Sequence, residues 1–261
     1  MKETKSLLNG LVACGVALAM VSTLAAQTAS QGSAKVVRLK GAARYAAGPN
    51  AGQLLKVGDI VKPGAVIQTA ADSRVDLVLG DGSAPVAQPT ATAAAGPPSA
   101  ASYSPSSEQN VVRLWENTLL SIDKLTETQT GADVVTETQL DLKAGHIFGI
   151  VKKTSAASKY EVKIPNGVAG IRGTVYDISA EGVIKVLSGS VVLAYVGPDG
   201  TVVTQVISAA QLFDARTGVL SALPVPGQDD LKRYLNQVRS GLTPAPVPVS
   251  ADMTLQYISP H

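Results

Sequence analysis

Side chains that could perform catalysis are few in this sequence and lie far apart. The two histidines are His146, which opens an apolar run, and His261, the last residue, and the single cysteine is Cys14. A metal site needs several clustered ligands, and a catalytic nucleophile needs a base beside it. Neither histidine has such neighbours, and the adjacent acids Asp229 and Asp230 suit the first turn of a helix. We therefore predict that the protein is not an enzyme and holds no cofactor or metal ion.

The segment Lys163–Ile178 (KIPNGVAGIRGTVYDI) places Gly167, Gly170 and Gly173 among apolar and β-branched residues. A glycine-rich loop that binds phosphate is followed by a helix, whose N-terminus faces the phosphate. Here the residues after the third glycine predict a strand, so we interpret the segment as a structural motif. Its glycines would form tight turns, one at Asn166-Gly167 and one near the last two glycines, and would let two strands approach closely.

The same motif contains Arg172 and Thr174, which flank the third glycine. Arg172 has two interpretations. It could be a largely buried arginine whose five donors bind neighbouring carbonyls and a carboxylate such as Asp177 or Asp76, or its side chain could be an exposed ligand contact. The first interpretation makes Arg172 a determinant of the fold.

The composition predicts an all-β protein. Only 4% of the residues are aromatic and 16% are charged, whereas 24 are glycine and 15 are proline, which suits short strands joined by many turns. Strand patterns recur about every 8–12 residues, as in sandwiches, rolls and short solenoids, and tight turns favour antiparallel pairing. We expect a single domain of many short, mainly antiparallel strands, with one C-terminal amphipathic helix. The net charge of +2 is spread along the chain, so nucleic acid is not an expected partner.

Residues 1–26 have the layout of a secretory signal peptide. Two lysines precede an apolar run that ends in small residues. A membrane-spanning helix needs about 20 apolar residues, and this run is shorter. We therefore expect cleavage after Ala25 or Ala26 and no retained transmembrane helix. The alternatives are a retained membrane anchor and lipidation of Cys14.

The exported chain is expected to contain one β domain, at residues 35–216, after a flexible polar lead-in at 27–34. Residues 83–110 consist mainly of Ala, Pro, Ser, Thr and Gly and predict a disordered insert. We place this insert at the tip of a hairpin between Arg74–Leu79 and Val111–Trp115, because a long loop adds little closure entropy.

Two further segments complete the prediction. The polar stretch 124–136 is expected to be a loop. Residues 217–261 are expected to form a helix at 228–239 and a Pro-rich tail. The helix should dock on the β domain through an apolar stripe formed by Leu231, Tyr234, Leu235 and Val238.

Four blocks, taken in order, resemble the FecR-domain family. They are VGDIVKPGAVIQTAADSRVDLVLGDGS at 57–83, DLKAGHIFGIV at 141–151, RGTVYDI at 172–178 and the glycine-containing ending at 186–193. The resemblance covers about residues 34–216. It implies an extracytoplasmic all-β module with a small-sheet or solenoid-like architecture. The best-known members of the family relay a signal from an outer-membrane transporter to a sigma factor.

The resemblance and the missing catalytic groups together lead to one expectation of function. We expect a periplasmic or secreted, non-enzymatic protein of the bacterial cell envelope that binds or scaffolds an envelope protein or polymer. The alternative is a regulator of cell-surface signalling through an outer-membrane receptor and a sigma factor, although we identify no cytoplasmic helical region that would hold a sigma factor. A hydrolase is the third possibility, and the lack of a catalytic constellation argues against it. The sequence leaves the oligomeric state open.

Overall fold

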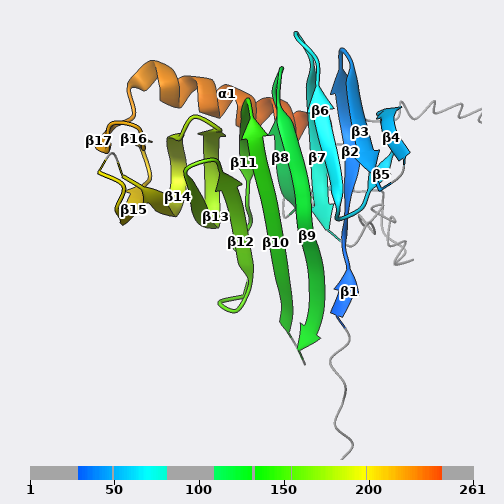
Figure 1. Ribbon diagram of the computed structural model, residues 1–261, viewed down its shortest axis with the longest axis horizontal. Coiled ribbons are helices and arrows are strands. Elements are labelled where there is room, and N and C mark those ends of the chain that lie inside the picture. Colours follow the sequence, from blue (N-terminus) through cyan, green and yellow to red (C-terminus); the bar gives the residue numbers. More distant parts are fainter. Residues whose placement is uncertain are drawn as a thin grey trace, which may run out of the picture.

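The computed structural model describes residues 29–48, 50–80, 109–130, 133–153, 155–197 and 199–242. These residues form one large, curled mixed sheet with the shape of a half-barrel, and a single C-terminal helix (Figure 1). The predicted fold class is thereby confirmed. The predicted signal peptide, nearly all of the predicted insert and the predicted Pro-rich tail lie outside the described residues. No helix in the described part of the chain is long and apolar enough to cross a membrane.

The elements follow one another along the chain, beginning with short strands and ending with the helix. In order they are β1 (Ala29–Gln31), β2 (Ser33–Lys40), β3 (Ala43–Ala47), β4 (Asn50–Leu54), β5 (Ile60–Val61), β6 (Ala65–Thr69), β7 (Arg74–Gly80), β8 (Asn110–Leu114), β9 (Leu119–Thr130), β10 (Asp133–Ala144), β11 (His146–Ile150), β12 (Lys159–Ile164), β13 (Gly167–Ser179), β14 (Val183–Val196), β15 (Val202–Ser208), β16 (Gln211–Asp214), β17 (Val219–Ala222) and α1 (Val225–Leu242).

The sheet has two flanks that share the long strands β13 and β14. In the first flank, β3, β6, β9, β10 and β12 lead to the first half of β13, the second half of β14 and then β15. In the second flank, β2, β7, β8 and β11 lead to the second half of β13, the first half of β14, then β16 and β17. All of these pairs are antiparallel except β10 with β12, which is parallel. The expected preference for antiparallel pairing is therefore confirmed.

The main core lies between the two flanks and is built by alternating residues. In β7, Val75, Leu77 and Leu79 belong to this core, whereas Asp76 and Val78 point to the opposite face. This is the period of two that the sequence predicts for a strand. Strand β7 pairs with β8, as expected for the two strands on either side of the insert.

The helix α1 covers the outer face of the second flank. Its stripe packs with side chains that point away from the main core, and together they form a second apolar cluster whose sheet residues include Val78, Val111, Phe148 and Val175. The predicted docking is confirmed, and the helix is longer at both ends than residues 228–239. Since it starts at Val225, with a proline at its second position, Asp229 and Asp230 fall after the first turn. They pair instead with Lys232 and Arg233, respectively.

Two segments that were expected to lack regular structure are strands. Residues 29–34, predicted to be a flexible lead-in, form β1 and the start of β2, and β1 pairs with β9. Residues 124–136, predicted to be a loop, contribute to the long hairpin of β9 and β10. The physical reason is that threonine and valine recur in this stretch and favour a pleated, half-exposed strand despite their polar neighbours.

Candidate binding surface

The Arg-Gly-Thr motif lies at a bulge in β13, not at a turn between two strands. The pairing of β13 with β14 shifts register between Arg172 and Val175. Gly173 has a φ of 60°, a left-handed conformation that glycine adopts without the steric cost of a side chain. The predicted second turn is therefore wrong, because β13 continues through this point and bends. The bend carries the strand from one flank of the sheet into the other.

A facing glycine and a threonine hold the bulge in place. At Gly189, which has a φ of 82°, an added Cβ would lie 2.3 Å from the carbonyl oxygen of Gly173. The Thr174 hydroxyl lies 2.8 Å from the Ser190 carbonyl oxygen and 2.9 Å from that of Arg172, and it accepts the Ser190 N–H at 3.1 Å. These contacts fix the angle between the two halves of β13.

The other two motif glycines differ in how closely the neighbouring strand approaches them. A Cβ at Gly167 would lie 2.5 Å from the Ala194 carbonyl oxygen, so only glycine fits there. At Gly170 the nearest atom, the Val192 carbonyl oxygen, would be 3.7 Å away, which is an ordinary contact. The predicted turn at Asn166-Gly167 is present, with Pro165 and Asn166 in the turn and Gly167 opening β13.

The arginine that binds a buried carboxylate is Arg113, whereas Arg172 is exposed. Arg113 on β8 donates through Nε to Asp76 Oδ1 at 2.7 Å and through Nη2 to Asp76 Oδ2 at 2.9 Å. Its third contact is Nη1 to Gln237 Oε1 at 2.9 Å, on the helix. The interpretation of Arg172 as a buried tie is wrong, since its side chain lies on the outer face of the sheet at the bulge.

Other polar side chains beneath the helix also serve the structure. Arg38 donates to the Gln237 carbonyl oxygen at 3.0 Å, which gives the helix a second anchor. Burial raises the pKa of Asp177, although Lys185 lies 3.4 Å away. His146, predicted to be a surface residue at a strand end, is half-buried and stacks on Trp115, and burial lowers its pKa.

An apolar patch covers the outer face of the first flank near its end. We call it the valine face, and its members come from three adjacent strands. The registers place them side by side, because the non-core residues of β14 oppose those of β13 and β15. The exposed large members are Val168 (38% exposed), Val192 (44%), Val196 (49%), Val202 (76%) and Val206 (51%), with Ala194 between them.

Strand β15 forms a free edge of the sheet beside this patch. Within the described residues it pairs with β14 alone. Its sequence, VVTQVIS, carries no charge. The exposed side chain of Arg172 is nevertheless close to this edge. Arg172 opposes Ser190 on β14, and Ser190 opposes Ser208 at the end of β15. The patch thus combines apolar side chains and an open strand edge, with Arg172 near its border.

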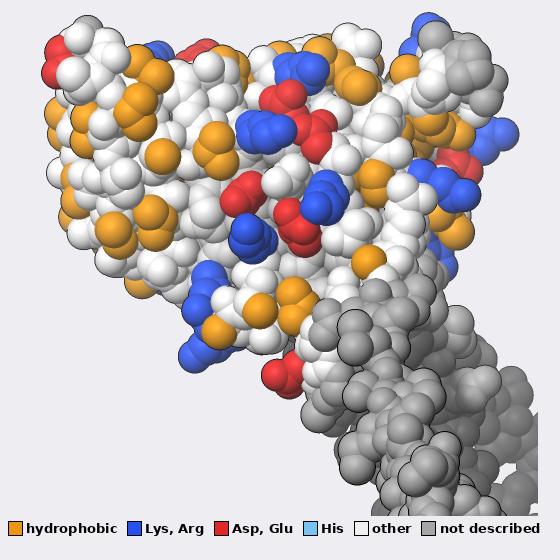
Figure 2. All heavy atoms as spheres, turned by 60° about the horizontal axis from the view of Figure 1, so that its bottom comes forward, with side chains coloured by type: hydrophobic (Ala, Val, Ile, Leu, Met, Phe, Trp, Pro, Cys, Tyr) orange, Lys and Arg blue, Asp and Glu red, His pale blue; other side chains and the backbone are white. Residues whose placement is uncertain are grey.

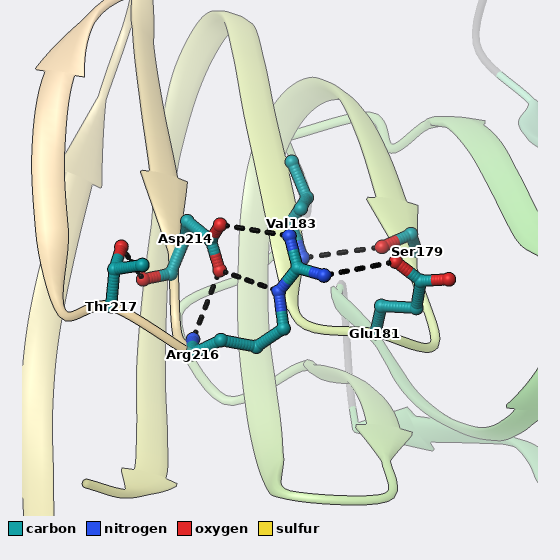
Figure 3. A network of polar contacts seen from close by, with 6 residues as sticks. All are labelled: Ser179, Glu181, Val183, Asp214, Arg216 and Thr217. Atoms are coloured by element: carbon teal, nitrogen blue, oxygen red, sulfur yellow. Dashed lines mark hydrogen bonds and ion pairs between the residues drawn. The ribbon is translucent and has the colours of Figure 1, made fainter. Parts of the chain in front are cut away.

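An ion-pair network lies in the second flank, where β16 pairs with the start of β14 (Figure 3). Arg216 contacts Asp214 at 3.0 Å and Glu181 at 3.3 Å, so it ties the turn after β16 to the turn between β13 and β14. The hydrogen bond from Arg216 lowers the pKa of Asp214. The network lies outside the valine face, which is formed by the other half of β14.

This surface was difficult to predict from the sequence. The runs Val191–Val196 and Val202–Ile207 are apolar on both faces of their strands, and such runs usually indicate burial on both sides. Within the described residues, no group of three His, Cys, Asp or Glu side chains could hold a metal ion.

Comparison with known proteins gives one family and one type of solved structure. The model of the FecR protein family matches residues 100–192. Two crystal structures of a proposed anti-sigma factor from Parabacteroides distasonis ATCC 8503 are similar, each with 13% identity and a TM-score of 0.32. The similarity covers 44% of this chain and about half, 51%, of that chain. No curated protein matches this sequence.

Proposed function

We propose, from the premise that residues 100–192 of this chain form a FecR domain, that the protein is a non-enzymatic binding or scaffolding module of the bacterial cell envelope. The matched region runs from the insert through β8 to the middle of β14. It therefore includes the bulge that bends the sheet, whereas β15 and its free edge lie beyond it. FecR domains are typically non-enzymatic, which supports this class of function.

The observation that carries the proposal is the valine face with its open edge. Soluble proteins seldom expose a contiguous apolar patch unless it binds something. They also guard edge strands with charged residues, proline or a covering element. Strand β15 has neither charge nor proline, and its outer neighbours are valines. A surface of this kind suits a partner that adds a strand or packs an apolar face against it.

The envelope location follows from the signal-peptide layout of residues 1–26. It is tested by fractionating cells that express the full chain and by measuring the mature N-terminus by mass spectrometry. Cleavage near Ala25 or Ala26 supports a periplasmic or secreted protein. A retained N-terminus would favour the alternative, a membrane-bound regulator of signalling through a receptor and a sigma factor, which is the role of the best-known members of the family.

Binding through the valine face is tested with two matched valine-to-lysine variants. Val192 lies in the centre of the face and is 44% exposed, while Val134, on β10 outside the face, is 41% exposed. Immobilised Val192→Lys protein should retain much less envelope material, whether protein or polymer, than the natural chain, and Val134→Lys should retain as much. Equal retention by both variants would contradict the use of this face.

A further inference from the structure

The backbone groups that β15 turns toward its open edge can be assigned from two side-chain contacts. The Gln205 amide donates to the Val206 carbonyl oxygen at 2.7 Å, and the Ser208 N–H donates to Gln211 Oε1 at 2.7 Å. Both backbone groups thus point away from β14. Because strand residues alternate, the N–H and C=O groups of Val202 and Thr204 point to the same edge. The edge therefore presents donors and acceptors at every second residue, of which the Val206 carbonyl and the Ser208 N–H already have side-chain partners.

The chain itself contains a segment that suits this edge, in the part that follows α1. Residues 253–259, MTLQYIS, form an uncharged seven-residue stretch, the same length as β15. Met253, Leu255 and Tyr257 alternate with smaller or polar residues, so in an extended strand they would share one face. The stretch also shares the pattern Gln-x-Ile-Ser with residues 205–208. An uncharged partner matches an uncharged edge.

We propose that residues 253–259 of one copy add as a strand to the free edge of β15 in a neighbouring copy. The added strand hydrogen-bonds to the outward-facing backbone of β15, and its apolar face extends the valine face by one strand. This is strand addition to an exposed sheet edge. It deepens the proposed function, on which it rests, by naming the partner of the valine face as a second copy of this chain.

The position of the helix explains why the donor comes from another copy. α1 begins beside β17 and runs across the second flank toward β2, where Arg38 contacts Gln237 (Figure 1). Its 18 residues span about 27 Å, so the tail leaves the domain at the end opposite to β15. Residues 243–252 contain three prolines and reach at most about 33–36 Å when fully extended. That length only modestly exceeds the length of α1, whereas a neighbouring copy can lie directly beside the tail.

The donor segment and the acceptor edge are different parts of the chain. Each copy can then accept one tail and donate another, which generates head-to-tail chains or closed rings, of which a reciprocal pair is the smallest. Mass should therefore rise above that of the monomer as the protein concentration increases.

The test uses the chain with its tail intact and one substitution that removes a single edge N–H. Thr204→Pro deletes a donor that faces the edge and leaves the pairing with β14 unbroken, and proline is tolerated at such edge positions. The control Thr204→Val keeps the N–H. A tail variant, with Leu255→Asp and Tyr257→Asp, keeps the edge intact. Mass is measured by analytical ultracentrifugation over a wide concentration range, with circular dichroism to verify the fold.

The natural chain and Thr204→Val should form species larger than the monomer, and both Thr204→Pro and the tail variant should lose every species above the monomer. An equimolar mixture of these two variants should form a dimer and stop there, because only one donor and one acceptor remain. A natural chain that stays monomeric overturns this proposal but leaves capture through Val192 intact. A tail variant that still dimerises overturns it in favour of edge-to-edge pairing. If assembly survives Thr204→Pro and capture survives Val192→Lys, both proposals fail.

Discussion

Two neighbouring regions of one sheet face solvent in different ways. On β9, β10 and β12 the outer side chains are charged and paired, as in Lys124 with Glu137 and Lys163 with Asp123. On β13, β14 and β15 the outer side chains are valines. Figure 2 shows this contrast, with blue and red side chains alternating over the centre of the face and orange side chains toward the left.

The boundary between the two regions is a single strand pair. Lys163 on β12 opposes Val168 on β13, so the charged pattern stops within one strand spacing of about 5 Å. Both regions belong to the same flank and lie over the same core. The difference therefore lies in the outer side chains and not in how the sheet folds: paired charges suit water, whereas the exposed valines form the surface that we propose binds a partner.

The largest expected effect is a loss of stability of the whole sheet, which carries both regions. Arg113→Ala leaves Asp76 as a buried carboxylate without its bidentate partner, which should lower the free energy of unfolding by about 3–5 kcal/mol. Urea denaturation followed by circular dichroism measures the change. The double variant Arg113→Met with Asp76→Leu removes both charges and should be far less destabilised. If Arg113→Ala unfolds like the natural chain, the ion pair has no structural role.

A smaller effect should fall on the bend that separates the valine face from the second flank. Gly189→Ala places a methyl group against the Gly173 carbonyl oxygen at a positive φ, and we expect a loss of about 1–3 kcal/mol in unfolding free energy. Gly170→Ala, on the valine face itself, meets only an ordinary contact and should change stability by less than about 0.5 kcal/mol. Thermal melts of the two variants measure the change. Equal shifts in their melting temperatures would show that a side chain at Gly189 does not strain the bulge.

The smallest effect concerns the charged region alone. Lys124 and Glu137 are partly exposed, so their ion pair should contribute about 0.2–1 kcal/mol. A double-mutant cycle with Lys124→Ala and Glu137→Ala, measured at low and high salt, should give a coupling energy that salt reduces. The same salt series should leave binding through the valine face nearly unchanged. A coupling energy that does not change with salt would contradict the view that this ion pair is a solvent-exposed electrostatic contact.

The alternation of residues predicted much of the fold. It identified β7 and β8 as partners, because their inward residues are apolar, and it found the helix from the spacing of its stripe. It failed at β9 and β10, where polar residues occupy both faces near the tip of the hairpin. Threonine-rich strands of this kind give no hydrophobic period, and their pairing depends on a neighbour, β1, that lies far away in sequence.

The two arginines show why the site was harder to predict. In the run VVRLW, the position of Arg113 opposite Asp76 follows from the register of β8 with β7. Its burial does not follow, because it depends on the helix that covers that face. Arg172 sits in the more conspicuous motif, yet nothing covers its face within the described residues, and it stays exposed. Tertiary packing decides which face of a strand is covered, and the sequence of that strand alone does not show it.

The placement of α1 has a mechanical consequence. A chain pulled by its tail would transmit the load first to the last turns of the helix, where Gln237 is held by Arg38 and Arg113. Because α1 lies across the strands, such a pull peels it from the sheet turn by turn, whereas a strand added along β15 would be loaded lengthwise, with all its hydrogen bonds sharing the force. The helix anchor, and not the strand junction, would then be the first part to yield under tension.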